Sequence, residues 1–393
     1  MAFTLIDGAN WTGGYNYLVN LLRSVDSHES ARLRPVLFHG DGIADSVLAP
    51  FQKMKGVEVV RTAVFNIDRA AARLKQAMLW GVDTQAIKIF QEQRIDVIFE
   101  PATFYGWRCP IPALAWLADF QHRRLRNQFG VKAYWRRDLG FRAQVASGRI
   151  IMLSSEDARA DCEVFYPDSV GRTVVVPFAV PAQNSDQLST DVIRHKYGLP
   201  ENFLFLPNQF WQHKNHLTII EALKVLQTTS SNIVVAASGN PVDQRHPALF
   251  ESLKKRVAAL GLEDQFRFLG MIPYSDLVAL MRGCTALVNP SLFEGWSTTV
   301  EEAKSLGVPL VLSDLNVHRE QAGDGAIYFK RDSPESAAQA LAEALSRYGN
   351  VDQNRREREA KIAANTRLAD FAGKFFQAAL LTVNSKKVKI PVS

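Results

Sequence analysis

Short apolar runs alternate with longer amphipathic stretches along most of this chain of 393 residues. Many of the runs are continuously apolar, which is typical of strands that are covered on both faces. Strands of this kind that alternate with helices favour parallel sheets wrapped by helices, the α/β class. We expect strands at residues 3–6, 35–39, 57–60, 96–99, 113–117, 150–153, 173–176, 203–206, 233–237, 266–269, 286–288, 310–312 and 326–329.

The alternation pauses at residues 177–190, a stretch rich in Pro, Ser, Asn and Gln. We predict that it connects two Rossmann-like domains, residues 1–178 and 179–366. A helix at residues 367–385 is expected to cross back to the first domain. Ligands of such sheets bind beyond the carboxyl ends of the strands, so a central cleft between two facing domains is the expected site.

The cysteines are few and isolated. Cys109, Cys162 and Cys284 lie far apart and have no His at metal-ligand spacing, so we expect small buried hydrophobes and no metal site. No run of about 18 apolar residues occurs. The first residues also lack the basic and apolar pattern of a secretory signal. These features predict a cytoplasmic protein.

A basic stretch lies between residues 122 and 142, where Asp138 is the one acidic residue and aromatic residues are interleaved. Such a mixture suits an anionic membrane face, here the inner face, or a phosphorylated acceptor. The alternative is a solvated helix face whose aromatic residues belong to the core. The patch is local, so the formal net charge of +6 does not indicate nucleic acid as a partner. The cations expected at the membrane are Arg123, Arg124, Arg126, Lys132, Arg136 and Arg137.

The most informative segment is residues 289–309, NPSLFEGWSTTVEEAKSLGVP. It predicts a loop after a buried strand and then a helix that begins at Ser297, a good N-cap, and ends before Gly307. Free amides at a helix N-terminus favour an anion such as a pyrophosphate. Glu294 and Glu302 could border the same pocket, where carboxylates suit sugar and ribose hydroxyls.

This segment resembles the signature of family 4 retaining glycosyltransferases of GT-B fold, the glycosyl transferases group 1. The resemblance is carried by Glu294, seven intervening residues and Glu302. It implies that Glu294 contacts the donor sugar, that Glu302 binds the ribose hydroxyls, and that amides between them meet the distal phosphate. The donor-binding residues implied within the segment are Gly295, Trp296, Ser297, Thr298 and Thr299.

A second match is PNQFWQHKNHLTIIEAL after the strand at 203–206. Family members have an arginine and a lysine here, and both cations clasp the donor pyrophosphate. Lys214 occupies the lysine position, but Gln209 stands where the arginine is expected. His213 and His216 have no further ligands nearby in the sequence, so we interpret them as ordinary helix-start residues.

Two loops of the second half also resemble the family. Backbone groups of Met271 and Ile272 are implied to pair with the nucleotide base, which leaves the identity of the base open. Ser238 and Gly239 offer another close backbone approach to the donor, although Gly239 is equally well explained as a turn glycine.

The first half resembles the family more thinly. Gly13 and Gly14 open a helix after the first strand, in a loop implied to lie beside the donor phosphate and the acceptor. In WLADFQHRRL the usual catalytic histidine is replaced by Ala118, whereas Asp119 and His122 remain as residues that could face the reacting sugar. His122 could equally be part of the basic patch.

The resemblance implies a metal-independent, retaining hexosyltransferase with no cofactor besides its donor, a GDP- or UDP-linked sugar. The implied acceptor is a glycan or a lipid-linked saccharide, in bacterial surface polysaccharide or lipopolysaccharide synthesis. Gln209 and Ala118 depart from the family pattern. They keep open an alternative, a catalytically weak nucleotide-binding partner subunit of a glycosyltransferase complex.

Overall fold

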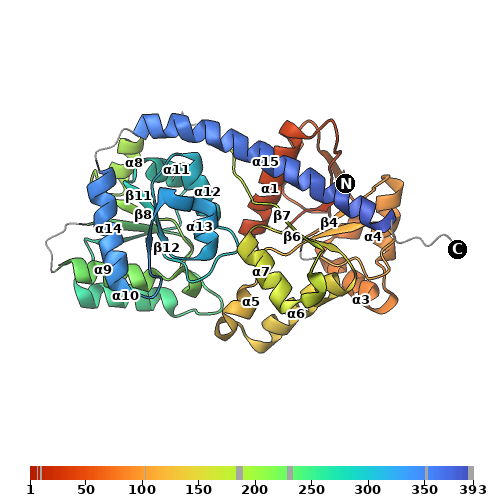
Figure 1. The fold of residues 1–393 in the computed structure, drawn as a ribbon, viewed down its shortest axis with the longest axis horizontal. Coiled ribbons are helices and arrows are strands. Elements are labelled where there is room, and N and C mark those ends of the chain that lie inside the picture. The colour runs from red at the N-terminus through yellow and green to blue at the C-terminus, as the bar shows by residue number, and fades with distance from the viewer. Residues whose placement is uncertain are drawn as a thin grey trace. The chain divides into compact units, whose positions relative to one another are not determined.

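Two β-sheets, in which every described strand pairing is parallel, form the centres of two units of the chain (Figure 1). The computed structural model describes residues 1–6, 8, 11–101, 103–182, 189–227, 233–349 and 353–387. Unit 1 comprises Met1–Arg123, Val131–Ala179 and the segment from Arg367 onward, and unit 2 comprises Arg124–Gly130 and Val180–Thr366. The α/β class predicted from the alternating pattern is confirmed.

The sheet of unit 1 has seven strands in the order β3-β2-β1-β4-β5-β6-β7. The strand order reverses between β1 and β4, so the carboxyl ends of these two strands form a topological switch point. Sheets of this kind bind ligands at such a point. The strands are β1 Ala2–Thr4, β2 Val36–His39, β3 Glu58–Arg61, β4 Ile98–Pro101, β5 Ala113–Trp116, β6 Ile150–Leu153 and β7 Thr173–Val175. The helices are α1 Thr12–His28, α2 Asp45–Gln52, α3 Ala70–Trp80, α4 Thr84–Glu92, α5 Gln121–Arg124, α6 Val131–Ala146 and α7 Glu156–Phe165.

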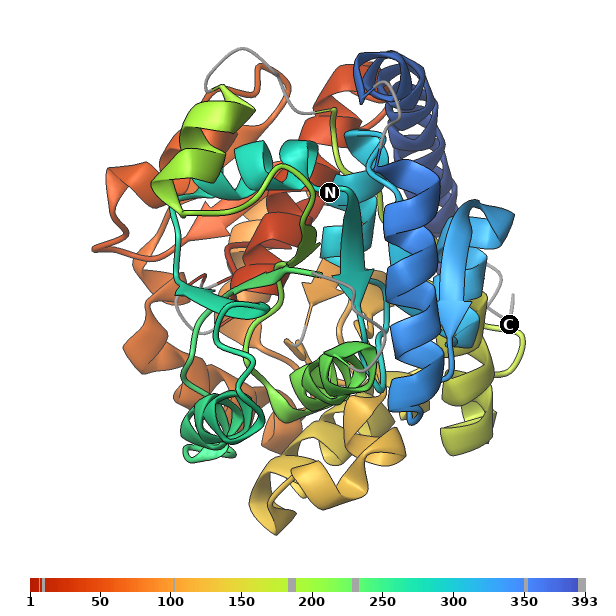
Figure 2. The same ribbon diagram turned by 90° about the vertical axis from the view of Figure 1, so that its left-hand side faces the viewer.

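The sheet of unit 2 has six strands in the order β10-β9-β8-β11-β12-β13, with its own switch point between β8 and β11. The strands are β8 Leu204–Leu206, β9 Val235–Ser238, β10 Phe266–Gly270, β11 Ala286–Asn289, β12 Leu310–Ser313 and β13 Ala326–Phe329. The helices are α8 Thr190–Lys196, α9 His216–Gln227, α10 Leu249–Leu260, α11 Tyr274–Gly283, α12 Thr298–Ser305, α13 Asn316–Ala322 and α14 Pro334–Tyr348. Helix α14 packs against α9 and β13 (Figure 2).

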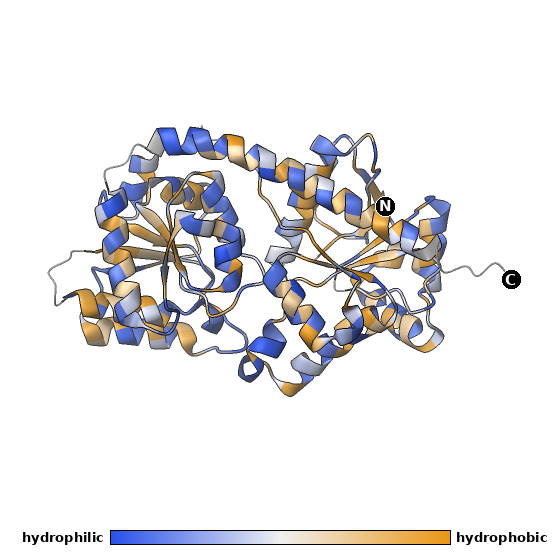
Figure 3. Ribbon diagram, in the orientation of Figure 1, coloured by the Kyte–Doolittle hydropathy of each residue, from blue (hydrophilic) through white to orange (hydrophobic). Residues whose placement is uncertain are grey.

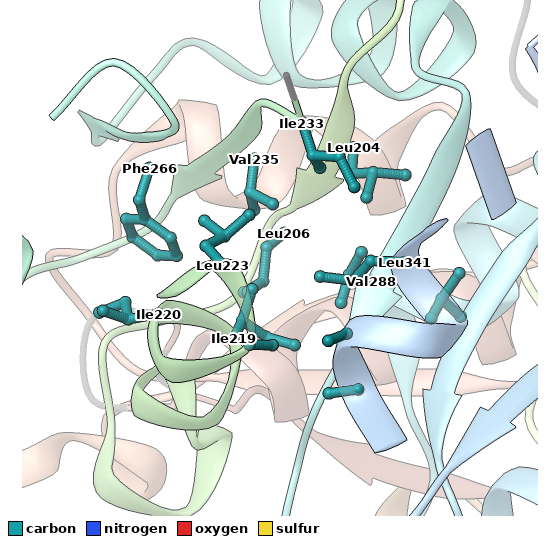
Figure 4. Close-up of a cluster of buried hydrophobic side chains, with 14 of the residues drawn as sticks. Leu204, Leu206, Ile219, Ile220, Leu223, Ile233, Val235, Phe266, Val288 and Leu341 are labelled. Carbon is teal, nitrogen blue, oxygen red and sulfur yellow. The ribbon is translucent and has the colours of Figure 1, made fainter. Parts of the chain in front are cut away.

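Most strands of both sheets are hydrophobic (Figure 3), although β3 begins and ends with an exposed charged residue. In unit 2, Leu206 and Val288 of the sheet meet Ile219 and Leu223 of α9 and Leu341 of α14, all buried (Figure 4). The opposite face of the same sheet buries a second cluster. Burial on both faces explains why these strands are continuously apolar in the sequence.

The long helix α15, Gln353–Lys387, begins in unit 2 and continues in unit 1. In unit 1 the Ser24 hydroxyl donates to the carbonyl oxygen of Leu368 at 2.8 Å. The ring of Phe375 lies 6.0 Å from that of Phe3 and 5.8 Å from that of Phe99. The last part of α15 is therefore part of the core of unit 1.

Unit 1 extends to Ala179, one residue beyond the predicted range 1–178, and the predicted range 179–366 also differs from unit 2 by one internal segment. Arg124–Gly130 groups with unit 2. There the guanidinium of Arg245 lies over the ring of Phe129 at 5.2 Å. Part of the predicted connection, residues 183–188, lies outside the described residues. Among the residues that are described, no helix combines the length and the apolar character needed to cross a membrane.

Candidate donor-binding site

The centre of the site is the turn between β11 and α12 in unit 2. Ser297 is the N-cap of α12, and its hydroxyl accepts a hydrogen bond from the amide of Val300 at 3.4 Å. The helix start predicted at Ser297 is confirmed. The amides of Thr298 and Thr299 belong to the first turn of this helix, which follows the carboxyl end of a strand. This arrangement favours an anion.

Lys214 and Glu294, both predicted from sequence, form an ion pair in the structure. The distance from Lys214 Nζ to Glu294 Oε1 is 2.5 Å, and their side chains are 14% and 9% exposed. Burial alone would raise the pKa of Glu294, but Lys214 and then His213 and His318 lower this pKa to about 2. Glu294 is therefore ionised at neutral pH and held against a cation.

A buried polar network that the sequence did not reveal supports Glu294. Its Oε1 also accepts from the Ser291 hydroxyl at 2.7 Å and from Asn289 Nδ2 at 3.5 Å. Asn289 Nδ2 donates to the Ser297 hydroxyl at 2.9 Å, and Asn289 Oδ1 accepts from Asn208 Nδ2 at 3.2 Å. The asparagine amides thus connect the ends of two adjacent strands to the Glu294 loop. Asn289 and Ser291 are visible in the sequence as the motif NPS, but Asn208, the partner of Asn289, lies 81 residues earlier in the chain.

Glu302 lies on α12 close to the loop that follows β10. The Tyr274 hydroxyl donates to Glu302 Oε1 at 3.4 Å, and burial raises the pKa of Glu302 to about 7. Met271, which is 67% exposed, and the half-buried Ile272 lie in that loop, three and two residues before Tyr274. The structure therefore brings the predicted ribose-binding glutamate next to the predicted base-binding loop.

The Gln209 side chain is engaged with a neighbouring loop. Its Oε1 accepts a hydrogen bond from the backbone amide of Asn240 at 2.6 Å. Gly239 has φ of +156°, and a Cβ at this position would lie 2.4 Å from the carbonyl oxygen of Asn208. Close packing of the loops that follow β8 and β9 therefore requires glycine at position 239, and it leaves Ser238 buried.

In unit 1, Gly13 and Gly14 lie in the first turn of α1. A Cβ at Gly14 would lie 2.4 Å from the indole of Trp11, whose ring stacks on that of Trp116 at 5.4 Å. Close approach by an aromatic side chain therefore explains Gly14. Whether the two glycines also contact a donor stays a prediction.

Asp119 and His122 are both held by other residues of unit 1. Asp119 pairs with Arg137 at 2.8 Å. The His122 side chain is fully buried, with Nε2 3.2 Å from the Tyr166 hydroxyl. Burial, and then the positive charge of Arg137, lowers the pKa of His122 to about 4, so its ring is neutral at physiological pH. Their predicted roles at the reacting sugar stay predictions.

The basic stretch is partly neutralised by contacts within unit 1. Asp138 is fully buried and accepts from Arg123 at 3.1 Å, from Arg142 at 2.7 Å and from the Tyr166 hydroxyl at 2.8 Å. Arg123 and Arg137 of the predicted membrane contact are therefore held in internal ion pairs. The remaining predicted cations, which are exposed, are Arg124, Arg126, Lys132 and Arg136.

All three cysteines are buried, as expected. Within the described ranges, no group of three or more His, Cys, Asp or Glu side chains is placed to hold a metal ion. Metal independence remains a prediction about activity.

Comparison with known proteins identifies proteins that are similar to this chain. Residues 189–367 match the model of the family described as glycosyl transferases group 1. Over 156 residues the chain is 30% identical to the O-antigen chain mannosyltransferase RfbU of Salmonella typhimurium, covering 38% of this chain and 42% of that protein. Over 182 residues it is 28% identical to the UDP-Gal:alpha-D-GlcNAc-diphosphoundecaprenol alpha-1,3-galactosyltransferase of Escherichia coli, covering 43% of each. The chain thus spans less than half the length of these curated relatives.

The fold has a counterpart over nearly the whole chain. A solved glycosyltransferase of Rickettsia africae superposes with a TM-score of 0.70, covering 99% of this chain and 98% of that one at 13% identity. Identity at this level shows the fold alone. The family model matches almost all of unit 2, and the superposition extends through unit 1. Residues 189–367 of this chain are therefore similar to the glycosyl transferases group 1 family, and the chain has the two-domain GT-B fold.

Proposed function

We propose that this chain transfers a hexose from a GDP- or UDP-linked sugar to a glycan or a lipid-linked saccharide. The observation that carries the proposal is the buried Lys214–Glu294 pair beside the N-terminus of α12. Lys214 Nζ has three hydrogens, and Glu294 takes one of them. The others are available to the phosphate oxygens of a nucleoside diphosphate.

The proposed roles follow from the charges in this unit. Lys214 and the first amides of α12 stabilise the charge that develops on the departing diphosphate. Among the described residues, the hydrogen bonds from Lys214, Asn289 and Ser291 to Glu294 all go to Oε1, and we assign Oε2 to a hydroxyl of the donor sugar. Glu302 accepts from the ribose hydroxyls in place of Tyr274, whose bond to it is long at 3.4 Å.

Retention of configuration and independence from metal are part of the same proposal. Stabilisation of the leaving group is assigned to Lys214 and to the helix N-terminus, so no divalent cation is required. The leaving phosphate oxygen accepts the acceptor proton on the same face of the sugar, and no protein base is required. The test of retention is the anomeric configuration of the product.

A role in surface polysaccharide synthesis is supported by the relatives. One is named for mannosyl transfer in the O-antigen chain, and another for galactosyl transfer to a diphosphoundecaprenol-linked sugar. On the basis of these relatives we propose the acceptor class for this chain, which is a growing glycan or a lipid-linked saccharide.

One observation favours a second candidate, a nucleotide-binding partner subunit with weak activity. Gln209 replaces the expected arginine, so a neutral amide, whose oxygen accepts from the Asn240 backbone amide, stands at the position of a cation. A neutral amide binds an oxyanion about half as strongly as a charged group does. This candidate predicts nucleotide binding without turnover.

The test combines binding and turnover in the same samples. Thermal unfolding is followed with UDP, GDP, ADP and their sugar conjugates, and donor hydrolysis and transfer to oligosaccharide or lipid-linked acceptors are then assayed. Binding to the native state raises the midpoint. Lys214→Ala should weaken diphosphate binding about tenfold, whereas Lys224→Ala on the exposed side of α9 should not. Binding without hydrolysis or transfer would favour the partner subunit, and unchanged binding in Lys214→Ala would contradict both candidates.

A further inference from the structure

Helix α3 of unit 1 packs against the rest of the unit through polar side chains. Arg73 Nε pairs with the buried Asp83 at 2.7 Å, and the Arg73 guanidinium lies over the ring of Phe65 at 4.4 Å. Gln76 donates to the Thr84 hydroxyl at 2.7 Å. Ala77 is the only residue of this helix that is buried. These contacts fix which side of α3 faces the core.

The other sides of α3 expose large apolar residues. Leu74 and Met78, four residues apart on one face, are 50% and 41% exposed, and Leu79 is 67% exposed. Trp80, at the end of the helix and on the side of Arg73, is 72% exposed. This is the reverse of an ordinary surface helix, which buries its apolar face and exposes its polar one. Contiguous apolar patches on a protein surface mark interaction sites.

Two neighbouring segments continue the apolar surface. Ile67, just before α3, is 79% exposed, and Trp107 is 47% exposed. A Cβ at Gly81, the residue after α3, would lie 2.7 Å from Trp107 Nε1 and 2.8 Å from Arg108 Cδ. Trp107 and Arg108 therefore lie directly against the end of the helix. We call this surface the α3 patch, made of Ile67, Leu74, Met78, Leu79, Trp80 and Trp107.

The charges around the α3 patch are mainly positive. Arg69, Lys75 and Arg108 are exposed. Asp68 is the one acidic residue between Ile67 and Trp80. Lys75 lies four residues before Leu79 on the same side of the helix, where its long stem can lie along apolar neighbours while its ammonium reaches an anion.

We propose that the α3 patch docks on the surface of an anionic lipid bilayer. Exposed leucine and methionine flanked by cations suit the boundary between acyl chains and anionic headgroups, and tryptophan prefers that same depth. The basic surround selects an anionic bilayer over a second copy of this chain, whose own patch would present like charge. This docking goes beyond the proposed transfer reaction, since it needs neither donor nor acceptor.

The proposal differs from the membrane contact predicted at residues 123–137. Two of those cations, Arg123 and Arg137, are held in internal ion pairs. Two that are exposed, Lys132 and Arg136 on α6, provide a matched comparison because they have the same charge and belong to the same unit. The experiment can therefore separate a docking surface on α3 from one on the basic stretch.

The test is co-sedimentation of the full chain with vesicles of phosphatidylcholine alone or mixed with phosphatidylglycerol. Wild type should bind the mixed vesicles, more weakly at high salt. The Leu79→Gln, Trp80→Gln double variant should bind at least about tenfold more weakly. Lys75→Ala should cost about fivefold for its one charge. Ile362→Gln, at an apolar position of unit 2 that is 72% exposed, should leave binding unchanged.

Vesicle binding that is unaffected by the double variant but lost in the Lys132→Ala, Arg136→Ala variant would overturn the proposal in favour of the basic stretch. Equal binding to both kinds of vesicle would also overturn it. So would dimerisation in the absence of lipid that the double variant abolishes, because the patch would then be an interface between copies. The substituted side chains are exposed, and an unchanged unfolding midpoint confirms that each variant is folded. Nucleotide binding should be equal in all of them, which separates this test from that of the proposed function.

Discussion

The Lys214 ammonium touches the same carboxylate oxygen of Glu294 that Ser291 and Asn289 also reach. The two residues are 80 positions apart, on the loops that follow β8 and β11, the strands at the switch point of the second sheet. Three donors on one oxygen fix the orientation of the carboxylate. An orientation fixed before a ligand arrives avoids reorganisation when it binds.

Glu294→Gln should separate sugar recognition from nucleotide recognition. The amide keeps the shape of the side chain but removes the charge that orients a sugar hydroxyl, so we expect transfer to fall about a hundredfold. Affinity for the nucleoside diphosphate alone should change little, because Lys214 remains. Steady-state kinetics and calorimetry measure the two quantities. A loss of diphosphate affinity as large as the loss of transfer would contradict this division of roles.

Asn289→Ala should weaken both stability and catalysis. The substitution leaves the buried Asn208 and Ser297 groups without their partner, and an unpaired buried polar group costs about 1–3 kcal/mol. We expect the free energy of unfolding to fall by about 2 kcal/mol, and kcat to fall more than KM rises. Urea unfolding and initial rates provide the measurements. If the variant keeps full stability, the network does not support the Glu294 loop as described.

Glu302 predicts a pH dependence of nucleotide binding. Its pKa is raised to about 7 by burial, and ribose hydroxyls donate more strongly to the ionised carboxylate than to the protonated one. Diphosphate affinity should therefore increase as pH rises through about 7, and Glu302→Gln should abolish the increase. Isothermal titration across this range measures the effect. An equal increase in the variant would assign the titration to another group.

The same group has the opposite effect on stability. Between its ordinary pKa of 4.5 and about 7, folded Glu302 retains a proton that the unfolded chain has lost. The free energy of unfolding contributed by this group therefore decreases as pH rises through that window. Glu302→Gln should flatten this slope in urea titrations of the protein without ligand.

Asp138→Asn should destabilise unit 1. Burial would raise the pKa of Asp138, but hydrogen bonds from Arg142 and Tyr166 keep this pKa below its ordinary value. The contribution is present above the ordinary pKa and is lost as pH falls below it. Breaking a buried ion pair costs about 3 kcal/mol, measured by urea unfolding near neutral pH. The exposed Asp168→Asn provides the control, and equal stability of the two variants would contradict the structural role of the buried carboxylate.

Chelation should leave transfer intact. With Lys214 and the α12 amides as the stabilising groups, EDTA should change the initial rate by less than about twofold. Activity lost with EDTA and restored by Mg²⁺ or Mn²⁺ would contradict this assignment. The control is the same assay with Lys214→Ala, which should be impaired with or without EDTA.

The strands could be predicted because burial on both faces leaves a local pattern. Residues 286–288 are continuously apolar and form most of β11, whereas β9 begins at Val235, two residues after its predicted start. The N-cap at Ser297 could also be predicted from the sequence, because its hydrogen-bond partner Val300 is only three residues away. Local regularities of this kind need no knowledge of the fold.

The parts of the site that escaped prediction depend on residues far apart in the chain. The Asn208–Asn289 bond and the engagement of Gln209 by Asn240 arise only when neighbouring strands align their ends. The reversed face of α3 was missed for a related reason. The side of a helix that carries Arg73 and Gln76 is typical of a side that faces solvent. In α3 this side faces the protein instead, because Arg73 binds the buried Asp83.

The shared helix α15 has a consequence for the order in which the protein assembles during synthesis. Phe375 packs on Phe3 and Phe99, so the core of the first unit lacks one of its aromatic rings until the second unit has been synthesised. The second unit, apart from the short Arg124–Gly130 segment, is continuous from Val180 to Thr366, and all of it emerges before Arg367. Domains usually fold in the order of their synthesis, amino-terminal first. Here the seven strands of the first sheet are synthesised early, but the core beside them stays incomplete while the second unit forms, and α15 then completes the unit that was begun first.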